Sequence, residues 1–346
     1  MEYKHIQRTY LIGWLIASIV WYLIRISTLE TGHLISNQLL VFFFTSWLSQ
    51  GFLYGILLYF ITRYITKRVK FYQMITIALV TQMVVAILII AIIYPVSKSF
   101  NLDGFPNSFF LFMTSRTVVF GTLYSLIVNA LIAVTMSASL ILGQGMLKNI
   151  ISGKYYTPQQ ETRIFMFLDL HDSTTIAEQL GHLAFSKLIQ DCFYELSIFN
   201  SHNGDIYKYV GDEAIITWPN DSKTNPIQCI QSFYAFAEKL EQKSAYFKSK
   251  YNVLPLFKAG IHIGSVTVTE IGKTKREIAY LGDTVNTTAR IQGECNRQKS
   301  SLLISEDLKN ILPLKSDYKL IDKGSFILRG KNKAINIFAV NLVSHN

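Results

Sequence analysis

Two aspartates in different parts of the chain occupy positions where paired carboxylates could act together on a phosphate group. Asp169 ends the apolar run 164–168, which predicts a strand buried on both faces. Asp212 lies in the Gly-Asp turn of a predicted hairpin at 205–218. If this hairpin pairs with the first strand, the two carboxylates can face each other and hold divalent ions. The alternative is that each aspartate only favours its own turn.

The segment after Asp169 has the composition of a phosphate-binding turn. A helix is expected to start near Ser173 or Thr174, both favourable N-caps, and to continue to about residue 200 with Leu183 on its apolar face. The free amides and the dipole at a helix N-terminus attract phosphate, and a neighbouring carboxylate can hold the accompanying cation. Strand, acid, turn and helix N-terminus together predict a polyphosphate site.

Four motifs occur in order along the polar half of the chain. They are Asp169 with its following Leu-x-x-Ser-Thr, Lys208-x-x-x-Asp212, the Gly-Ile-His-x-Gly segment at 260–264, and Gly282-Asp-x-Val-Asn286-x-x-x-Arg290. In order and spacing they resemble the catalytic domain of class III nucleotidyl cyclases, over residues 162–340. The resemblance implies an α+β domain with a ferredoxin-like core, and the alternation of predicted strands and helices suggests a mainly antiparallel sheet covered by helices.

The resemblance also implies a reaction, in which the ribose 3′ oxygen attacks the α-phosphate of a nucleoside triphosphate and pyrophosphate leaves. It assigns two Mg²⁺ or Mn²⁺ ions to Asp169, Asp212 and the Leu170 carbonyl. Arg290 would stabilise charge at the α-phosphate, and Asn286 would orient the ribose. The other implied phosphate contacts are the amides of the turn and two basic residues near the C-terminus: His171, Asp172, Ser173, Thr174, and Arg329 or Lys331.

Base selection is where the chain departs from the family pattern. Lys208 matches the lysine that reads adenine in adenylate cyclases, where guanylate cyclases usually have Glu. The partner position is Ala279, where the family commonly has Asp or Thr, and alanine cannot accept a hydrogen bond from the adenine amino group. Lys208 donates, which suits adenine N1 and opposes the N1–H of guanine. ATP is therefore the predicted substrate, with guanylate cyclase activity as the alternative.

In this family one catalytic domain supplies the metal-binding acids and a second supplies the base, ribose and arginine positions. A single domain here carries all of them, which implies a homodimer with two equivalent sites. Two other interpretations stay open. A diguanylate cyclase would use the Val-Gly-Asp-Glu-Ala hairpin, but that leaves Asn286 and Arg290 unexplained. A non-catalytic membrane receptor would bind nucleotide through a degenerate cyclase domain, and Ala279 keeps this alternative open.

Half of the residues are hydrophobic and 16% are charged, and the apolar excess lies in the first 150 residues. Four segments are long and apolar enough to cross a bilayer as helices: 10–29, 39–62, 72–94 and 117–141. The polar residues Gln50, Gln82 and Asn129 within them are expected to make hydrogen bonds between helices. The chain therefore divides into a four-helix transmembrane domain (1–142), a linker helix (143–160) and a catalytic domain (161–346).

Basic residues predict the orientation of these segments in a bacterial inner membrane. Lys4 and Arg8 precede the first segment, four basic residues crowd the loop 63–70, and Lys148 and Lys154 follow the fourth. The positive-inside rule places both termini and the catalytic domain in the cytoplasm. Of the net charge of +10, +7 lies before residue 151. The basic balance thus reflects membrane topology, and no nucleic-acid partner is needed to explain it.

The remaining residues with chemical potential do not indicate another activity. Cys192, Cys229 and Cys295 lack Cys-x-x-Cys spacing, so neither a zinc site nor a disulfide is expected. His171 and His262 are interpreted as a turn residue and a packing residue, and no Ser/His/Asp set is evident.

Overall fold

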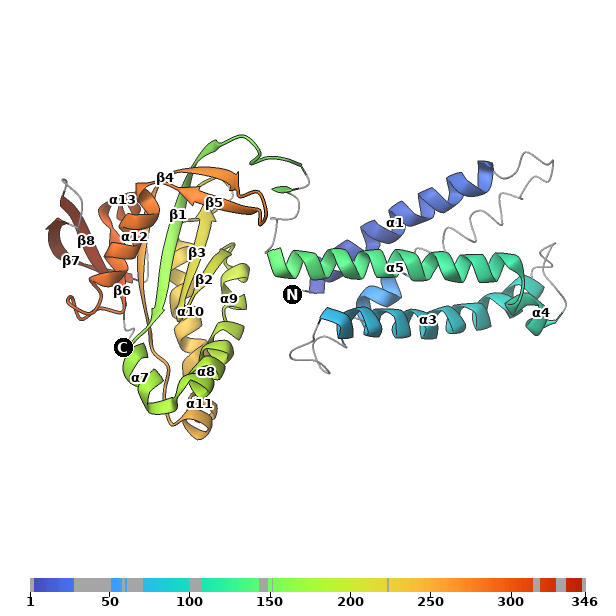
Figure 1. The fold of residues 1–346 in the computed structure, drawn as a ribbon, viewed down its shortest axis with the longest axis horizontal. Coiled ribbons are helices and arrows are strands. Elements are labelled where there is room, and N and C mark those ends of the chain that lie inside the picture. The colour runs from blue at the N-terminus through green and yellow to red at the C-terminus, as the bar shows by residue number, and fades with distance from the viewer. Residues whose placement is uncertain are drawn as a thin grey trace. The chain divides into compact units, whose positions relative to one another are not determined.

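The computed structural model describes residues 3–27, 51–57, 60, 71–99, 108–142, 149–150, 152–222, 224–313, 318–327 and 334–343. The chain divides into two compact units, Met1–Leu142 and Gly143–Asn346, and Figure 1 labels the elements of each.

The first unit consists of apolar helices. Its described elements are α1 (Tyr3–Ser27), α3 (Phe71–Ser99), the short α4 (Phe109–Met113) and α5 (Arg116–Leu142), with a further helical stretch at 51–57. Among the described helices, two contain stretches long and apolar enough to cross a membrane, Ile75–Ile92 and Val118–Ser139. The predicted first segment overlaps α1, and the predicted second segment, 39–62, lies mostly outside the described residues.

Polar side chains inside this unit join α3 to α5. Gln82 Nε2 donates a hydrogen bond to Ser125 Oγ at 2.9 Å, and Asn129 Nδ2 donates to the side-chain oxygen of Gln82. All three residues are buried. The prediction that Gln82 and Asn129 link helices is confirmed, and Gln50 lies outside the described residues. Because these groups are surrounded by apolar side chains, their pairing helps to fix which faces of the two helices meet.

The second unit is built on one sheet. Its strands are β1 (Gln159–Leu170), β2 (Asp205–Val210), β3 (Glu213–Pro219), β4 (Phe257–Ile271), β5 (Glu277–Leu281), β6 (Leu302–Ser305), β7 (Tyr318–Ile327) and β8 (Ala334–Leu342). The order is β2-β3-β1-β4-β6-β8-β7, with β5 paired to β4. The pairs are antiparallel except β4 with β6. The predicted α+β class and the pairing of the hairpin with the first strand are confirmed.

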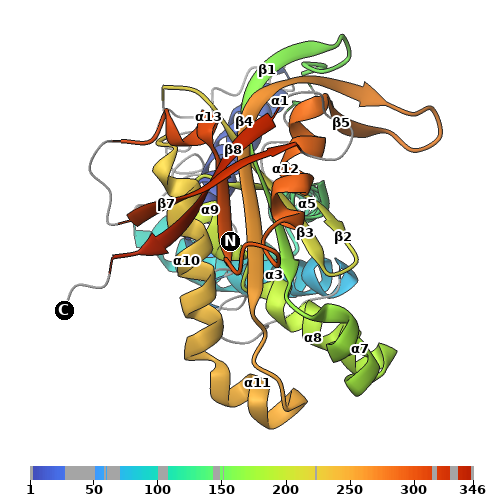
Figure 2. The ribbon, with the colours of Figure 1, turned by 90° about the vertical axis from the view of Figure 1, so that its left-hand side faces the viewer.

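Helices cover both faces of this sheet (Figure 1, Figure 2). They are α7 (Ser173–Leu180), α8 (His182–Tyr194), α9 (Ser197–Ser201), α10 (Ile227–Gln242), α11 (Ser244–Tyr251), α12 (Asp283–Gly293) and α13 (Glu306–Lys309). Ile164, Met166 and Leu168 of β1 pack with α7 to α11, whereas Phe165 and Phe167 pack on the face that carries α12. Because both faces of β1 are covered, its apolar run is uninterrupted.

Two predicted helices are wrong in length. The helix expected from Ser173 or Thr174 to about residue 200 breaks at Gly181, whose φ is +74°, a backbone conformation that favours glycine. Leu183 consequently is 73% exposed and not on the apolar face, while Leu188 is buried as expected. The helix expected from residue 225 to 250 also breaks, between α10 and α11.

The segment of the second unit that precedes β1 packs against its sheet. Tyr155 is buried in the same cluster as Phe165, and its carbonyl accepts a hydrogen bond from Glu270 N at 2.8 Å. The compact unit therefore begins before residue 161, within the segment interpreted as a linker.

Gly260 of β4 provides a test of how closely α12 approaches the sheet. A Cβ at this position would lie 2.3 Å from Gln292 N, a backbone atom that cannot move without displacing α12. Gly260→Ala is expected to destabilise the second unit by about 1–3 kcal/mol, as overpacking does. Gly293→Ala on the same helix is the control, because no heavy atom lies within 4 Å of its new Cβ. Thermal unfolding of the full chain in detergent measures both, and equal transition temperatures would contradict the close approach.

Candidate active site

Strand register brings carboxylates together at one end of β1 and β3. Asp169 of β1 pairs with Glu213, the first residue of β3, and Asp212 precedes Glu213 in the hairpin turn. Burial raises the pKa of Asp169 above its ordinary value, the Lys258 ammonium offsets part of this shift, and the Asp212 carboxylate adds to it. The structure therefore places Asp169 and Asp212 side by side.

Glu213 is a third member of this cluster and was not predicted from the sequence. Burial, together with the smaller effects of the charges of Asp169 and Asp212, raises the pKa of Glu213 to about 7. Like charges held together in partial burial disfavour ionisation. The cluster thus concentrates negative charge that a cation would relieve.

Lys258 supplies positive charge at this point. Its Nζ lies 3.3 Å from Asp169 Oδ2, and its side chain is only 13% exposed. Gln292 Nε2 of α12 donates to the same oxygen at 3.0 Å, and Lys258 Nζ donates to Asn296 Oδ1 at 3.2 Å. Neither Lys258 nor Gln292 was predicted from the sequence. Lys258 is paired with Asp169 in the register between β1 and β4, so a prediction of that register would have identified the lysine.

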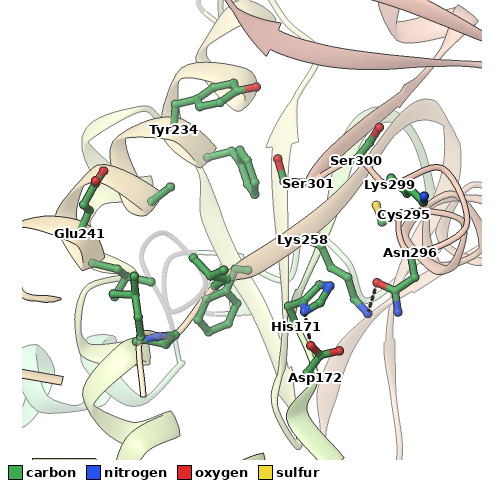
Figure 3. Close-up of a pocket in the computed structure, with 17 residues that line it drawn as sticks. His171, Asp172, Tyr234, Glu241, Lys258, Cys295, Asn296, Lys299, Ser300 and Ser301 are labelled. Carbon is green, nitrogen blue, oxygen red and sulfur yellow. Dashed lines mark hydrogen bonds and ion pairs between the residues drawn. The ribbon is translucent and has the colours of Figure 1, made fainter. Parts of the chain in front are cut away.

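A cavity of about 750 Å³ lies beside Lys258. Figure 3 shows Lys258 and Asn296 joined on its wall, next to the paired side chains of His171 and Asp172. The lining also includes apolar side chains from α10 and from the chain before β4, among them Phe233. There is therefore open space next to Lys258 and the turn that follows β1, although Asp169, Asp212 and Glu213 do not line it.

The turn after β1 differs from its prediction in two ways. The N-cap of α7 is Asp172, in place of Ser173 or Thr174, and its φ of +53° lies in the left-handed region. His171 N donates to Leu256 O at 2.8 Å. The prediction that the His171 amide is free for phosphate is therefore wrong. The His171 ring lies beside the Asp172 carboxylate, with Nδ1 2.9 Å from Oδ2.

The start of α7 has backbone amides that lack an acceptor within the helix, which the predicted phosphate-binding turn requires. The first hydrogen bond within the helix runs from Ile176 N to Asp172 O at 3.0 Å. The amides of Ser173, Thr174 and Thr175 precede it and have no acceptor within the helix. They form a short row of donors that can bind an anion.

Asn286 and Arg290 lie one turn apart on α12. Asn286 is exposed. Arg290 Nη1 is buried and has no hydrogen-bond partner among the described residues. Because a buried guanidinium nitrogen without an acceptor is unfavourable, this atom favours an anionic ligand beside it.

The positions implied for base selection lie on β2 and β5. Lys208 is half-exposed, and Ala279 is buried where β5 pairs with Thr269 of β4. Lys208 Nζ lies 3.7 Å from Glu277 Oε1, two residues before Ala279. Arg329 and Lys331 lie outside the described residues.

The donor chemistry at the carboxylate cluster fits divalent cations. Carboxylate oxygens are the ligands that Mg²⁺ and Mn²⁺ prefer, and Asp169 presents them from β1 and Asp212 from the turn between β2 and β3. Leu170 ends β1 with its side chain in the core, so its carbonyl is the group that could serve as a ligand. Asp169 is already paired with a cation, Lys258, which shows that its environment stabilises positive charge beside it.

Comparison with known families defines the class of the second unit. The family described as "Adenylate and Guanylate cyclase catalytic domain" matches residues 155–341, more than half of the chain. The chain therefore belongs to this family, the class III nucleotidyl cyclases. The match includes Asn286 and Arg290, which the diguanylate cyclase interpretation leaves unexplained.

Individual relatives agree with this class. The chain is 32% identical over 218 residues to adenylate cyclase 2 of Rhizobium meliloti, covering 63% of this chain and 60% of the relative. It is 26% identical over 181 residues to an adenylate cyclase of Anabaena cylindrica, covering 51% of this chain and 36% of that protein. The chain thus spans less than two thirds of each of these relatives.

A solved structure shares the fold. A bacterial light-regulated adenylyl cyclase superposes with a TM-score of 0.55 at 17% identity, over 66% of this chain and 67% of that chain.

The contact between Lys258 and Asp169 predicts a competition between the lysine and a metal ion. Lys258→Met keeps an apolar stem and removes the charge, so Mn²⁺ is expected to bind about tenfold more tightly in the absence of nucleotide, a change of ~1.4 kcal/mol. Lys187→Met, at an exposed position of α8, controls for the loss of one charge and is expected to bind Mn²⁺ as the wild type does. Titration of the full chain with Mn²⁺ measures both, and weaker binding by the Lys258 variant would show that the lysine supports the metal site.

Proposed function

We propose that this chain is a membrane-bound adenylate cyclase that converts ATP to 3′,5′-cyclic AMP and pyrophosphate at a homodimer interface. The observation that carries the proposal is the meeting of Asp169 and Asp212 at the ends of adjoining strands. Family membership and the adenylate cyclases among its relatives support it. The buried guanidinium nitrogen of Arg290, which has no hydrogen-bond partner among the described residues, disfavours a degenerate, non-catalytic domain.

Asp169 and Asp212, with the Leu170 carbonyl, would hold two Mg²⁺ or Mn²⁺ ions. When bound, such ions promote ionisation of the attacking hydroxyl and neutralise the triphosphate. The amides of Ser173 to Thr175 bind phosphate oxygens at the start of α7. Lys258, whose Nζ lies 3.3 Å from Asp169 Oδ2, would donate to the phosphates at this end of β1.

The remaining groups act on the other side of the nucleotide. Arg290 donates to the α-phosphate with a buried nitrogen that has no competing acceptor among the described residues. Asn286, one turn away on the same face of α12, orients the ribose. Lys208 reads the base, and its donor character favours adenine at N1.

The direction of Arg290 supports a site shared between two copies. Gln292 of α12 contacts Asp169 of its own chain. Residues two apart on a helix point to opposite sides, so Arg290 and Asn286 point away from the Asp169 to which Gln292 is bonded. A second copy, arranged with two-fold symmetry, brings its Arg290 to this Asp169, and the Arg290 of the first copy reaches Asp169 of the second.

The first unit anchors the enzyme in the inner membrane through four spans, with both termini and the catalytic domain in the cytoplasm. Large apolar side chains are exposed on its described helices, including Ile16, Leu23, Leu88, Ile92, Phe120 and Leu131. Such surfaces are unfavourable in water and suit contact with lipid. The excess of basic residues in the segments assigned to the cytoplasm gives the orientation.

The reaction can be tested on the purified full chain. With Mn²⁺, ATP is expected to give cyclic AMP and pyrophosphate, identified by mass, and GTP is expected to react more slowly. Asp169→Ala, Asp212→Ala and Arg290→Ala are each expected to lower the rate by about 100-fold or more, as the loss of a charge-stabilising group does. A wild-type chain that makes neither cyclic nucleotide would contradict the proposed activity.

Mixing variants tests the shared site. In a random mixture of Asp169→Ala and Arg290→Ala chains, half of the dimers contain both variants and each has one intact site, so about a quarter of wild-type activity is expected. A mixture of Asp169→Ala with Asp212→Ala is the control, because every site then lacks one acid, and it is expected to stay inactive. Equal activity in the two mixtures would contradict a site shared between the two chains.

Membrane topology can be tested by cysteine labelling, because the native Cys192, Cys229 and Cys295 are buried. His33→Cys, in a predicted outer loop, is expected to react with an impermeant maleimide in intact cells. Lys67→Cys, in a predicted cytoplasmic loop, is expected to react only after lysis. The opposite pattern, or labelling of both positions in intact cells, would contradict the proposed orientation.

A further inference from the structure

Ala279 cannot accept a hydrogen bond with its side chain, yet a carboxylate lies beside the lysine implied to read the base. This carboxylate belongs to Glu277, whose Oε1 lies 3.7 Å from Lys208 Nζ. We propose that Glu277 is a specificity-determining residue, which accepts the hydrogen bond of the adenine amino group in place of a side chain at position 279. This inference rests on the proposed cyclase function and adds a second base-reading contact to it.

The strand geometry places Glu277 and Ala279 on the same face of β5. Residues two apart on a strand share a face, and the residues between and after them point to the other side. Ile278 and Tyr280 pack on that other side, where Tyr280 contacts the rings of Phe165 and Tyr207 at centroid distances of 5.3 and 4.7 Å. The register with β4 fixes this arrangement, since Glu277 pairs with Ile271. Glu277 is therefore held on the face where the base-reading position lies.

The short side chain at position 279 complements the long one at 277. Ala279 is 6% exposed and extends no further than its Cβ. The Glu277 side chain is 41% exposed and extends toward Lys208 of β2. A carboxylate displaced by two residues along the strand can thus occupy the side of the lysine that a residue at 279 would otherwise take.

Lys208 and Glu277 form a donor next to an acceptor. A lysine ammonium can only donate, and an ionised carboxylate can only accept. The edge of adenine presents an acceptor, N1, beside a donor, the amino group. The edge of guanine presents N1–H and O6 in the opposite order. The pair therefore matches adenine at both points and opposes guanine at both, with a charged group at each.

Glu277 has one other cationic neighbour among the described residues, and this neighbour provides a matched control. Lys275 Nζ lies 3.5 Å from Glu277 Oε2, and the Lys275 side chain is 87% exposed. Exposed ion pairs of this kind contribute little, so Lys275 does not hold Glu277 away from a ligand. Lys275→Ala removes a partner of the carboxylate and leaves the carboxylate itself in place.

The test compares three triphosphates on the full chain: ATP, GTP and purine riboside 5′-triphosphate, which keeps N1 and lacks the amino group. Glu277→Ala is expected to lower kcat/KM for ATP about tenfold and to leave that for purine riboside triphosphate unchanged. The ratio of the GTP and ATP values is expected to rise at least tenfold, since the charge facing O6 is also lost. Lys275→Ala is expected to change none of the three values.

The analogue separates recognition from positioning. If Glu277 only orients Lys208, the values for ATP and for the analogue fall together, because both bases present N1, and the inference is overturned. An unchanged ATP value in Glu277→Ala overturns it as well. Glu277→Gln covers the case of a misfolded alanine variant: its amide oxygen still accepts and its nitrogen can donate to O6, so a smaller loss with ATP and a gain with GTP are expected.

The two proposals fail in different ways. A wild-type chain that yields no cyclic product from any triphosphate contradicts the cyclase function. If the wild type forms cyclic AMP, and the ratio of kcat/KM for ATP to that for the analogue is the same in Glu277→Ala as in the wild type, only the role of Glu277 is contradicted.

Discussion

The concentration of negative charge at the ends of β1 and β3 is the constraint on which the rest of the second unit depends. Asp169, Asp212 and Glu213 repel one another, and this repulsion adds to the effect of burial in raising the pKa of Glu213 to about 7. The fold offsets it with groups brought from distant segments, Lys258 from β4 and Gln292 from α12. Because β1 lies between β3 and β4 in the sheet, Asp169 has a cross-strand neighbour on each side. The register fixes these neighbours as Glu213 and Lys258.

Helix α12 shows how a single close approach serves this cluster. Gly260 of β4 leaves room for the backbone of the helix at Gln292, and that residue bonds Asp169. Any side chain at position 260 would move the helix and, with it, the hydrogen bond to the carboxylate. The glycine in the Gly-Ile-His-x-Gly motif therefore has a packing role that leads directly to the charge balance of the site.

Local patterns in the sequence were sufficient where one segment determined the outcome. The uninterrupted apolar run 164–168 indicated a strand covered on both faces, and the Gly-Asp turn indicated the hairpin that pairs with it. Local patterns were insufficient where the structure of a segment depended on contacts with a distant segment of the chain. The apolar spacing past Gly181 suggested a continuous helix, but the chain turns there so that α8 can pack its own face on the sheet. The free amide expected at His171 is used by Leu256, which lies far away in sequence.

The same limit explains the site residues that the motifs did not reveal. Lys258 and Glu277 stand outside the motif positions. Lys258 becomes visible through its cross-strand neighbour Asp169, and Glu277 through the side chain of Lys208, which lies on a strand that is not paired with β5. Motif spacing along one segment carries no information about such pairs, since the arrangement of the strands in the sheet decides them. A substitution within a motif, such as Ala279, is therefore best interpreted together with the side chains that the sheet places around it.

In the proposed homodimer, α12 would take part in two sites at once. One side of the helix holds Asp169 of its own chain through Gln292, and the opposite side presents Asn286 and Arg290. A rotation or shift of this helix would therefore change the charge balance at the metal-binding acids of one site and the position of the arginine at the other. Because the helix is packed against β4 without spare room at Gly260, such a movement requires the sheet to move with it. Activity in both sites would then depend on the arrangement of the two catalytic domains, and the proposed membrane anchor of each chain would act through that arrangement.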